Sequence, residues 1–257
     1  ALDTAGSTAA VSTASIFQVS GDNCKITGGY FTGAASYDGG NDIPTTSNGF
    51  AIILVSGDNF TLDDVRHLNT QQVFIWFKDC TSGTVKGCDL NGGYTVPATN
   101  LPNGTGHFGI MLDPDTSNET SNFLITENRI HGYIEGISPA NLGTGAVISG
   151  IVITNNFFYD ISDHGIYSNL THGAVITGNN FVDCHIGVVI TGNYNNVSSN
   201  TMYSTVASGT DRSLQAGISV RSGSYNNVSS NTIRMIDVRM NAIGINVQYI
   251  QDLTGTT

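Results

Sequence analysis

Acidic and histidine side chains precede four successive segments that begin with glycine and continue with apolar residues. These side chains are His107, Glu135, Asp163, His164 and His185. If the segments are neighbouring strands of one sheet, equivalent residues lie about 5 Å apart, and those two strands away lie about 10 Å apart. Two carboxyl groups about 5 to 9 Å apart can cleave a glycosidic bond, because one donates a proton while the other attacks the sugar or activates water.

The pattern predicts that Glu135 forms a catalytic carboxylate pair with Asp163 or with Asp113. Asp113 lies near the end of the first segment, and Asp160, three residues before Asp163, is a further candidate acid. The neighbouring histidines are predicted to contact the substrate: His107, His164 and His185. An alternative stays open, in which these turn residues only hydrogen-bond the backbone of adjacent strands.

Alternation of apolar and polar residues predicts which side chains point outward from these strands. Taking the residue after each glycine as inward gives one outward row: Met111, Asp113, Ser138, Tyr167, Asn169, Val189, Ser219 and Arg221. The segment 73–79 has no glycine, and the same register makes Phe74, Trp76 and Lys78 outward. Because aromatic rings offer apolar area to the C–H face of a sugar, Trp76 and Tyr167, with Lys78 nearby, are predicted to bind a glycan. Scattered surface aromatics or a subunit interface would explain the same residues.

An internal repeat defines the elements that must position these side chains. The segment Tyr194–Thr201 recurs letter for letter as Tyr225–Thr232. With looser copies, the repeat places an equivalent apolar residue at eight positions: Ile26, Leu62, Val85, Ile125, Ile153, Ile176, Val197 and Val228. Successive gaps are 36, 23, 40, 28, 23, 21 and 31 residues, so the basic unit has 21 to 23 residues and longer gaps carry insertions. Short alternating runs between turns rich in Asn and Gly indicate strands, and no segment shows a helical period.

Strands at this period predict a coil that stacks on copies of itself, with parallel ladders between coils and a column of apolar side chains inside. Two motifs, Ile176-Thr-Gly-Asn-Asn-Phe181 and Val197-Ser-Ser-Asn-Thr201, stand at matching places in successive coils. They resemble the stacked asparagine turns of the pectate-lyase-like superfamily of right-handed parallel β-helices. The predicted fold is therefore all-β, a right-handed parallel β-helix (solenoid) of about 8–10 coils with turn insertions.

One β-helix domain is expected over residues 1–257, with an irregular entry segment at 1–15, coils over 16–250 and a tail at 251–257. The last coil is followed by a short tail with no amphipathic capping segment. Since solenoids need covered ends, we expect this chain to be part of a larger chain, a homotrimer or a larger assembly.

The resemblance implies a function as well as a fold. The superfamily includes polysaccharide lyases, galacturonase-type hydrolases and bacteriophage tailspike depolymerases, whose sugar chains lie along the outer face of the first strand of each coil. Insertions would wall such a groove at 32–48, 92–106, 113–122, 138–148 and 203–215. The expected function is binding and hydrolysis of a surface polysaccharide, as in an extracellular phage tailspike on a virion tail, or at a cell surface.

Two alternatives stay open. One is a non-catalytic structural or adhesive β-helix of a virion appendage or a bacterial adhesin. The other is a polysaccharide lyase, which must neutralise a uronate carboxylate and supply a base. The chain has only 9 Lys and Arg residues against 20 Asp and Glu, a net charge of −11. This balance disfavours a polyanionic substrate, nucleic acid and anionic lipid, and no apolar run is long enough for membrane insertion.

No cofactor is expected from the residue pattern. Ca²⁺ at Asp113-Pro-Asp115 stays open, because carboxylate oxygens are its ligands, although the twelve-residue EF-hand pattern is missing. The four cysteines lack the spacing of a zinc site: Cys24, Cys80, Cys88 and Cys184. They are interpreted as small buried residues, and their disulfide state is left undecided by the sequence.

Overall fold

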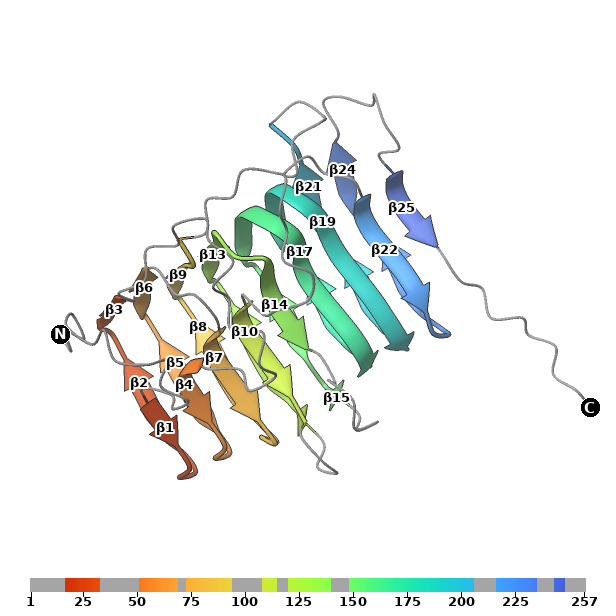
Figure 1. The fold of residues 1–257 in the computed structure, drawn as a ribbon. Helices are drawn as coiled ribbons and strands as arrows, with labels where there is room; N and C mark the ends of the chain where they lie inside the picture. The colour runs from red at the N-terminus through yellow and green to blue at the C-terminus, as the bar shows by residue number, and fades with distance from the viewer. Residues whose placement is uncertain are drawn as a thin grey trace, which may run out of the picture.

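The computed structural model describes residues 17–32, 51–68, 73–93, 108–114, 120–139, 148–205, 216–234 and 243–247. Within these ranges every regular element is a β-strand, and neighbouring strands pair in parallel. The strands stack as successive coils along one axis, from the N-terminal coil at one end to the C-terminal coil at the other (Figure 1). The architecture is an all-β parallel β-helix, as the repeat predicts.

Each coil has three faces, and the second face defines the coils. Its strands form one eight-stranded sheet and are numbered here as coils 1 to 8. They are β2 (Lys25–Thr27), β5 (Phe60–Asp63), β8 (Gly83–Lys86), β12 (Phe123–Thr126), β16 (Val152–Thr154), β18 (Val175–Thr177), β20 (Asn196–Ser198) and β23 (Asn227–Ser229). The eight apolar residues that the repeat makes equivalent, from Ile26 to Val228, form one column on this sheet, each in register with the next.

The first and third faces belong to one seventeen-stranded sheet. The first face holds β1 (Phe17–Val19), β4 (Ala51–Val55), β7 (Val73–Lys78), β10 (Phe108–Asp113), β14 (Glu135–Pro139), β22 (Ala216–Ser222) and β25 (Ile243–Val247). The third face holds β3 (Tyr30–Thr32), β6 (Arg66–Leu68), β9 (Asp89–Asn91), β13 (Arg129–His131), β21 (Thr201–Tyr203) and β24 (Thr232–Arg234). Two long strands, β17 (Phe157–His172) and β19 (Asn180–Asn193), turn from the third face of one coil onto the first face of the next. The short strands β11 (Thr120–Ser121) and β15 (Ile148–Ser149) pair where the first face meets the second.

A column of glycines brings the coils close together on the first face. Its members are Gly109, Gly136, Gly165, Gly187, Gly217 and Gly244. A Cβ on Gly165 would lie 2.6 Å from the Phe181 ring and 2.7 Å from the carbonyl oxygen of Gly187. Only a residue without a side chain fits there. The residue before each glycine therefore stands outside the coil, and this is where Glu135 and His164 lie.

The residues of the predicted outward row lie in register from strand to strand: Trp76 with Met111 and Ser138, and Tyr167 with Val189 and Ser219. Four of them are nonetheless buried, so the row is not an exposed surface along its whole length: Met111, Ser138, Val189 and Ser219.

The prediction for Phe74 is wrong, because Phe74 occupies the inward glycine position. Its side chain is fully buried and packs against the rings of Phe31 and His67, with centroids 5.9 and 4.3 Å away. Phe74 and Ile75 both join the inner core, so strict alternation fails at the start of the strand.

Asparagines stack where the second face turns into the third. The ladder consists of Asn128, Asn156, Asn179, Asn200 and Asn231, and each Nδ2 donates to the Oδ1 of the next at 3.0 Å. Each Nδ2 also donates to a strand carbonyl of the preceding coil, such as that of Ile153 for Asn179 at 2.9 Å. The residue before each asparagine has a positive φ. The repeated Asn in the sequence thus fixes both the bend and the spacing of the coils.

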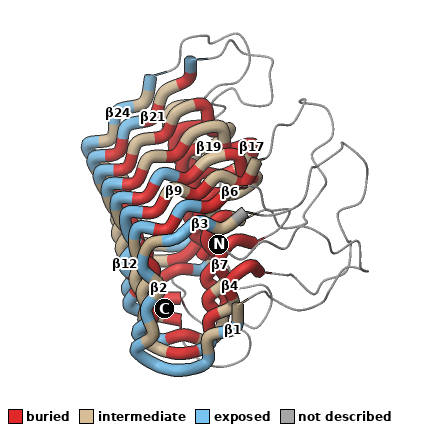
Figure 2. Tube along the Cα trace, turned by 90° about the vertical axis from the view of Figure 1, so that its left-hand side faces the viewer, coloured by how far each residue is buried: buried red, intermediate tan, exposed pale blue. Residues whose placement is uncertain are grey.

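The interior is a continuous apolar column, and buried positions recur at the same place in successive coils (Figure 2). Phe158 and Phe181 stack at 4.7 Å between centroids. Cys80, Cys88 and Cys184 are buried and Cys24 is half-buried, and all four are free thiols. Burial raises the pKa of the Cys80 thiol to about 12 and that of Cys88 to about 11. In the described ranges no helix has the length and hydropathy needed to cross a membrane.

Candidate functional site

His164 joins the two carboxylates that the sequence predicts as a pair. Glu135 and His164 are in register on adjacent strands of the first face. The Nδ1 of His164 lies 3.4 Å from Glu135 Oε1, and its Nε2 lies 3.2 Å from Asp163 Oδ1. A bulge in β17 at Ser162 and Asp163 adds one residue relative to β19, so both Asp163 and His164 are set at the cluster.

Burial differs across the acid–histidine cluster. The side chains of His164 and Glu135 are 8% and 13% exposed, whereas that of Asp163 is 36% exposed. Glu135 Oε2 is buried with no hydrogen-bond partner in the described structure, which leaves one carboxylate oxygen unsatisfied. Since buried polar atoms are rarely left without a partner, this oxygen is suited to receive a hydrogen bond from a bound molecule.

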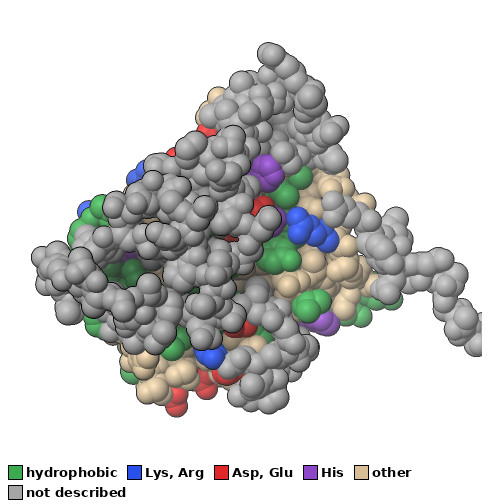
Figure 3. All heavy atoms as spheres, in the orientation of Figure 1, with side chains coloured by type: hydrophobic (Ala, Val, Ile, Leu, Met, Phe, Trp, Pro, Cys, Tyr) green, Lys and Arg blue, Asp and Glu red, His purple; other side chains and the backbone are tan. Residues whose placement is uncertain are grey.

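Arg221 and Tyr167 complete the cluster. Arg221 Nη2 lies 3.2 Å from His164 Nε2, and its guanidinium is 5.8 Å from the centre of the Tyr167 ring. The rings of His164 and Tyr167 stack at 5.0 Å between centroids. On this side of the molecule acidic, histidine, basic and hydrophobic side chains lie next to one another (Figure 3). The arrangement offers two carboxylates, an imidazole, a cation and an aromatic face to one ligand.

Glu135, Asp163 and His164 also meet the distance requirement of a metal site. One ligand atom from each lies within 4.8 Å of the other two. Two carboxylate oxygens and an imidazole suit Zn²⁺ better than Ca²⁺, which prefers oxygen ligands alone. The Arg221 guanidinium beside His164 adds positive charge, which opposes a cation at this place.

Asp113 and Asp160 lie away from this cluster. Phe108 is in register with Glu135, and Asp113 lies five residues further along β10, in register with Lys78. At the usual rise of a strand, this is roughly 16 Å along the strand. The structure therefore does not bring Asp113 into the pair with Glu135.

Asp160 belongs to the corner between the third and first faces. Its carbonyl accepts a hydrogen bond from Gly132 N at 3.2 Å, and its charge acts on His131 and Tyr159. Burial lowers the pKa of His131, and the nearby charges of Asp89 and Asp160 offset part of that effect. Asp160 thus acts on His131 and Tyr159 and not on the acid–histidine cluster.

Trp76 and Lys78 lie on the same face, three coils before Tyr167. Lys78 Nζ is 5.7 Å from the centre of the Trp76 ring, and Trp76 packs on an outer apolar cluster formed by Ala51, Val73 and Met111. Three coil spacings make roughly 14 Å between Trp76 and Tyr167. The predicted aromatic residues thus stand along one face and not side by side.

The remaining predicted histidines have different outcomes. His185 lies one coil after the bulge, between Cys184 and Ile186, which are in register with Ile161 and His164. It is therefore adjacent to the cluster. His107 lies outside the described residues, as do Asp115 and most of the insertions predicted to wall the groove.

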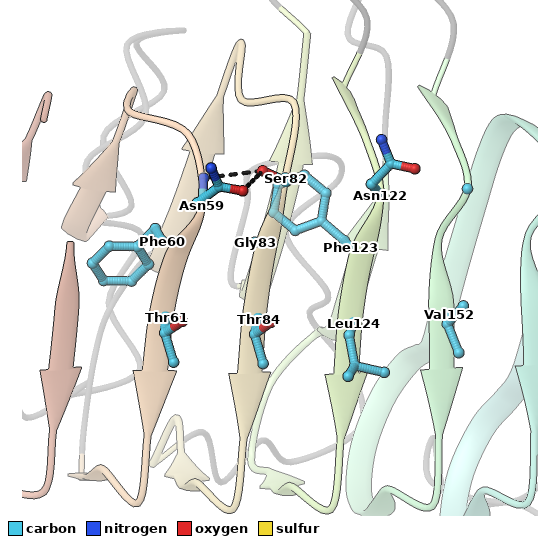
Figure 4. A pocket seen from close by; sticks show the side chains of 11 residues that line it. Asn59, Phe60, Thr61, Ser82, Gly83, Thr84, Asn122, Phe123, Leu124 and Val152 are labelled. Carbon is cyan, nitrogen blue, oxygen red and sulfur yellow. Dashed lines mark hydrogen bonds between the residues drawn. The ribbon is translucent and has the colours of Figure 1, made fainter. Parts of the chain in front are cut away.

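A groove of about 600 Å³ opens on the second face, and none of these residues lines it (Figure 4). Its lining is made of small polar and apolar side chains from coils 2 to 5: Asn59, Phe60, Thr61, Ser82, Gly83, Thr84, Asn122, Phe123, Leu124, Gly150 and Val152. Ser82 Oγ donates to Asn59 Oδ1 at 2.6 Å at the edge of this groove. Because no acid, base or histidine lines it, the groove offers no catalytic chemistry.

Sequence reasoning missed the connection between Arg221 and His164. Arg221 was predicted to point outward, and in the structure it contacts His164 two coils away. It is the extra residue of a bulge in β22, between Val220 and Ser222. The order of the coils in the sequence predicts neither how far the Arg221 side chain extends nor the bulge.

Comparisons with known proteins show little likeness. No protein-family model matches the chain, and no curated protein sequence matches it significantly. Among solved structures, the chain is similar to an alginate lyase from Paenibacillus sp. strain FPU-7, with 12% sequence identity and a TM-score of 0.37. The similarity covers 72% of this chain and 75% of that chain. A similarity this weak carries no argument about activity, so any function must be argued from the residues themselves.

Proposed function

We propose that this chain binds a polysaccharide along the first face of the β-helix and hydrolyses it at Glu135 and Asp163. The observation that carries the proposal is the acid–histidine cluster, in which His164 contacts both carboxylates and an oxygen of each lies within 4.8 Å of the other. This spacing fits the closer of the two carboxylate arrangements of glycosidases, which retain the configuration of the sugar.

In this mechanism the two acids have separate roles. Asp163, the more exposed carboxylate, attacks the anomeric carbon, while Glu135 protonates the glycosidic oxygen and the glycosidic bond breaks. Water then displaces Asp163 from the sugar, and Glu135 takes the proton of that water. His164 holds both carboxylates in place, and Tyr167 offers its ring to the sugar. Trp76 and Lys78 extend the binding face over earlier coils.

The test is incubation with a panel of bacterial capsular and O-antigen polysaccharides, measuring new reducing ends. Glu135→Gln and Asp163→Asn are expected to lower kcat by about 100-fold or more, because each removes a group that acts in the transition state. Glu127→Gln and Asp64→Asn are matched controls, since both side chains are exposed at distant turns. A chelator is expected to leave cleavage unchanged. Cleavage that is unaffected by Glu135→Gln and Asp163→Asn would move the site elsewhere.

A lyase is the second candidate, and the position of Arg221 favours it. A guanidinium 3.2 Å from His164 could neutralise a uronate carboxylate beside an imidazole base. A lyase product carries a new double bond and absorbs in the ultraviolet, whereas a hydrolase product does not. Ultraviolet absorbance that grows with the reducing ends, and is lost in Arg221→Gln but not in Arg234→Gln, would replace hydrolysis by elimination.

The setting that accompanies this proposal is extracellular, on a virion tail or a cell surface, in a homotrimer or a larger assembly. If no polysaccharide of the panel is cleaved but one is bound, the adhesive alternative takes its place.

A further inference from the structure

We propose that the corner between the first and second faces of coils 6 to 8 binds the ring of an uncharged sugar, in a notch between Tyr194 and Gly173. The notch is separate from the acid–histidine cluster and does not rest on the hydrolysis proposed there.

Two stacked tyrosines form one wall of the notch. Tyr194 and Tyr225 are equivalent residues of the repeated segment, and their rings lie 5.1 Å apart at an interplanar angle of 5°. This separation matches the spacing of neighbouring coils, about 4.8 Å, so the ring faces look along the axis of the β-helix. Both side chains are exposed, at 63% and 74%. The face of Tyr194 that does not meet Tyr225 points toward coil 6.

Gly173 leaves that face of Tyr194 open. Gly173 is the equivalent of Tyr194 in coil 6, since Gly173 N donates to the carbonyl of Asn193 and Tyr194 N to that of Ser224, both at 3.0 Å. The three residues have nearly the same backbone conformation, with φ of 68° at Gly173, 59° at Tyr194 and 58° at Tyr225. A Cβ on Gly173 would meet nothing within 4 Å. The stack of rings therefore ends at Tyr194, and the face of its ring over Gly173 is left open.

Leu170 adds apolar surface beside the notch. It lies in coil 6 on the same corner, is 45% exposed, and its backbone N donates to Thr191 Oγ1 at 2.6 Å. Of the seven large hydrophobic side chains exposed in the described ranges, Leu170, Tyr194 and Tyr225 are three. Their concentration on one corner marks a patch and not a scatter of single residues.

Most polar groups around the patch are amides and hydroxyls. Asn193 Oδ1 accepts from Ser224 N at 2.7 Å, and Asn196 Oδ1 accepts from Asn227 Nδ2 at 3.1 Å. The segments 170–175, 193–198 and 222–229 contain no Asp, Glu, Lys or Arg, and besides the tyrosines their one titratable side chain is His172. An aromatic face bordered by amides and hydroxyls fits a pyranose, which has an apolar C–H face and a rim of hydroxyls. An uncharged sugar is favoured because these segments offer no carboxylate, ammonium or guanidinium group.

Saturation-transfer NMR with three methyl pyranosides, those of glucose, galactose and mannose, tests the notch directly. We expect transfer to the C–H protons of one face of at least one sugar. Tyr194→Asn removes the ring but tolerates the positive φ, and it is expected to weaken binding by about tenfold or more. Tyr194→Phe keeps the ring and should keep the signal. Tyr30→Asn is the matched control, since Tyr30 is 50% exposed and lies at the other end of the β-helix.

Four results would overturn the proposal. They are no transfer to any of the three sugars, a signal unchanged in Tyr194→Asn, a signal lost in Tyr194→Phe while that variant melts normally, and a signal lost in Glu135→Gln. The last result would assign the signal to the acid–histidine cluster.

Discussion

His164 can exchange hydrogen-bond partners by moving one proton. Its Nε2 lies 3.2 Å from both Asp163 Oδ1 and Arg221 Nη2. A protonated Nε2 donates to the carboxylate, whereas a bare Nε2 accepts from the guanidinium. At Nδ1 the partner is the Glu135 carboxylate, which accepts a hydrogen bond from a protonated Nδ1. At the scale of single residues, the partners of His164 therefore depend on which ring nitrogen carries the proton.

Thiol labelling tests the burial of the cysteines. In the native protein at pH 8 we expect iodoacetamide to modify Cys24, which is half-buried, and to spare Cys80, Cys88 and Cys184. These three are buried, and burial raises the pKa of each thiol. Intact-mass measurement should show one adduct, none in Cys24→Ser, and four after unfolding of the original chain. Rapid native labelling of a second cysteine would contradict the packing of the core.

The buried thiols also predict the behaviour of the protein at high pH. Burial raises the pKa of Cys80 from 9.0 to about 12, so between these values the folded state holds a proton that the unfolded state has lost. The contribution of this thiol to the free energy of unfolding should therefore be constant below pH 9 and should fall as the pH rises further. Urea titrations at pH 8 to 11 check this, and Cys80→Ala should show a shallower decline. An equal decline in both proteins would exclude Cys80 as the cause.

At the scale of elements, the glycine column decides how closely the first-face strands approach. Gly165→Ala would place a methyl group 2.6 Å from the Phe181 ring and 2.7 Å from a backbone oxygen. We expect a loss of about 1 to 3 kcal/mol in the free energy of unfolding, as for other overpacked cores. Gly244→Ala is the control, because the same column position in the last strand has nothing within 4 Å. Thermal melts of equal midpoint for both variants would disprove the close approach.

The asparagine ladder makes a second prediction at this scale. Asn179 donates to the carbonyl of Ile153 and accepts from the backbone N of Asn156, both inside the turn. Asn179→Ala leaves these buried groups without partners and should lower the free energy of unfolding by about 2 to 4 kcal/mol. Asn227 is exposed and its side-chain hydrogen bonds lie at the surface, so Asn227→Ala should change it by less than about 0.5 kcal/mol. Chemical denaturation distinguishes the two, and similar losses would refute the ladder.

The elements were predictable because their signals are local and repeated. The column from Ile26 to Val228 follows from periodicity, and the outward row follows from the glycines. Phe74 was misplaced because two successive side chains enter the core at the start of its strand. The cluster was only half predictable, since Glu135 and His164 are in register on adjacent strands, whereas Arg221 contacts His164 across two coils. A contact across two coils depends on the conformation of the Arg221 side chain, which the repeat in the sequence does not indicate.

At the scale of the whole molecule, most of the few cations in the described ranges lie either beside Asp63 or over an aromatic ring. Lys25 and Lys86 both pair with Asp63 on the second face, at 3.0 and 3.8 Å. Lys78, Arg129 and Arg221 instead lie over the rings of Trp76, Tyr159 and Tyr167. Three of the seven Lys and Arg residues in the described ranges thus lie beside aromatic residues of the first and third faces. This placement favours ligand contact there over the second face.

The last strand predicts association. In β25, Ile245 and Val247 are 49% and 55% exposed. Since exposed apolar side chains side by side on one strand favour contact with another molecule, we expect the molar mass measured by light scattering to rise with concentration. Ile245→Lys with Val247→Lys should suppress the rise, and Leu124→Lys, at an exposed position in the middle of the second face, should not. A constant monomer mass for the unaltered chain would refute the expected assembly.

The stacking of unequal coils also has a mechanical consequence. Because the ladder bonds run from coil to coil, a force that pulls the two ends apart loads them along the axis and should release coils one after another. A released chain extends by about 3.5 Å per residue. The 21 residues from Ile176 to Val197 would yield about 70 Å, and the 40 from Val85 to Ile125 about 140 Å. Each step in a force trace would thus carry the length of its own coil and show the order in which the β-helix unwinds.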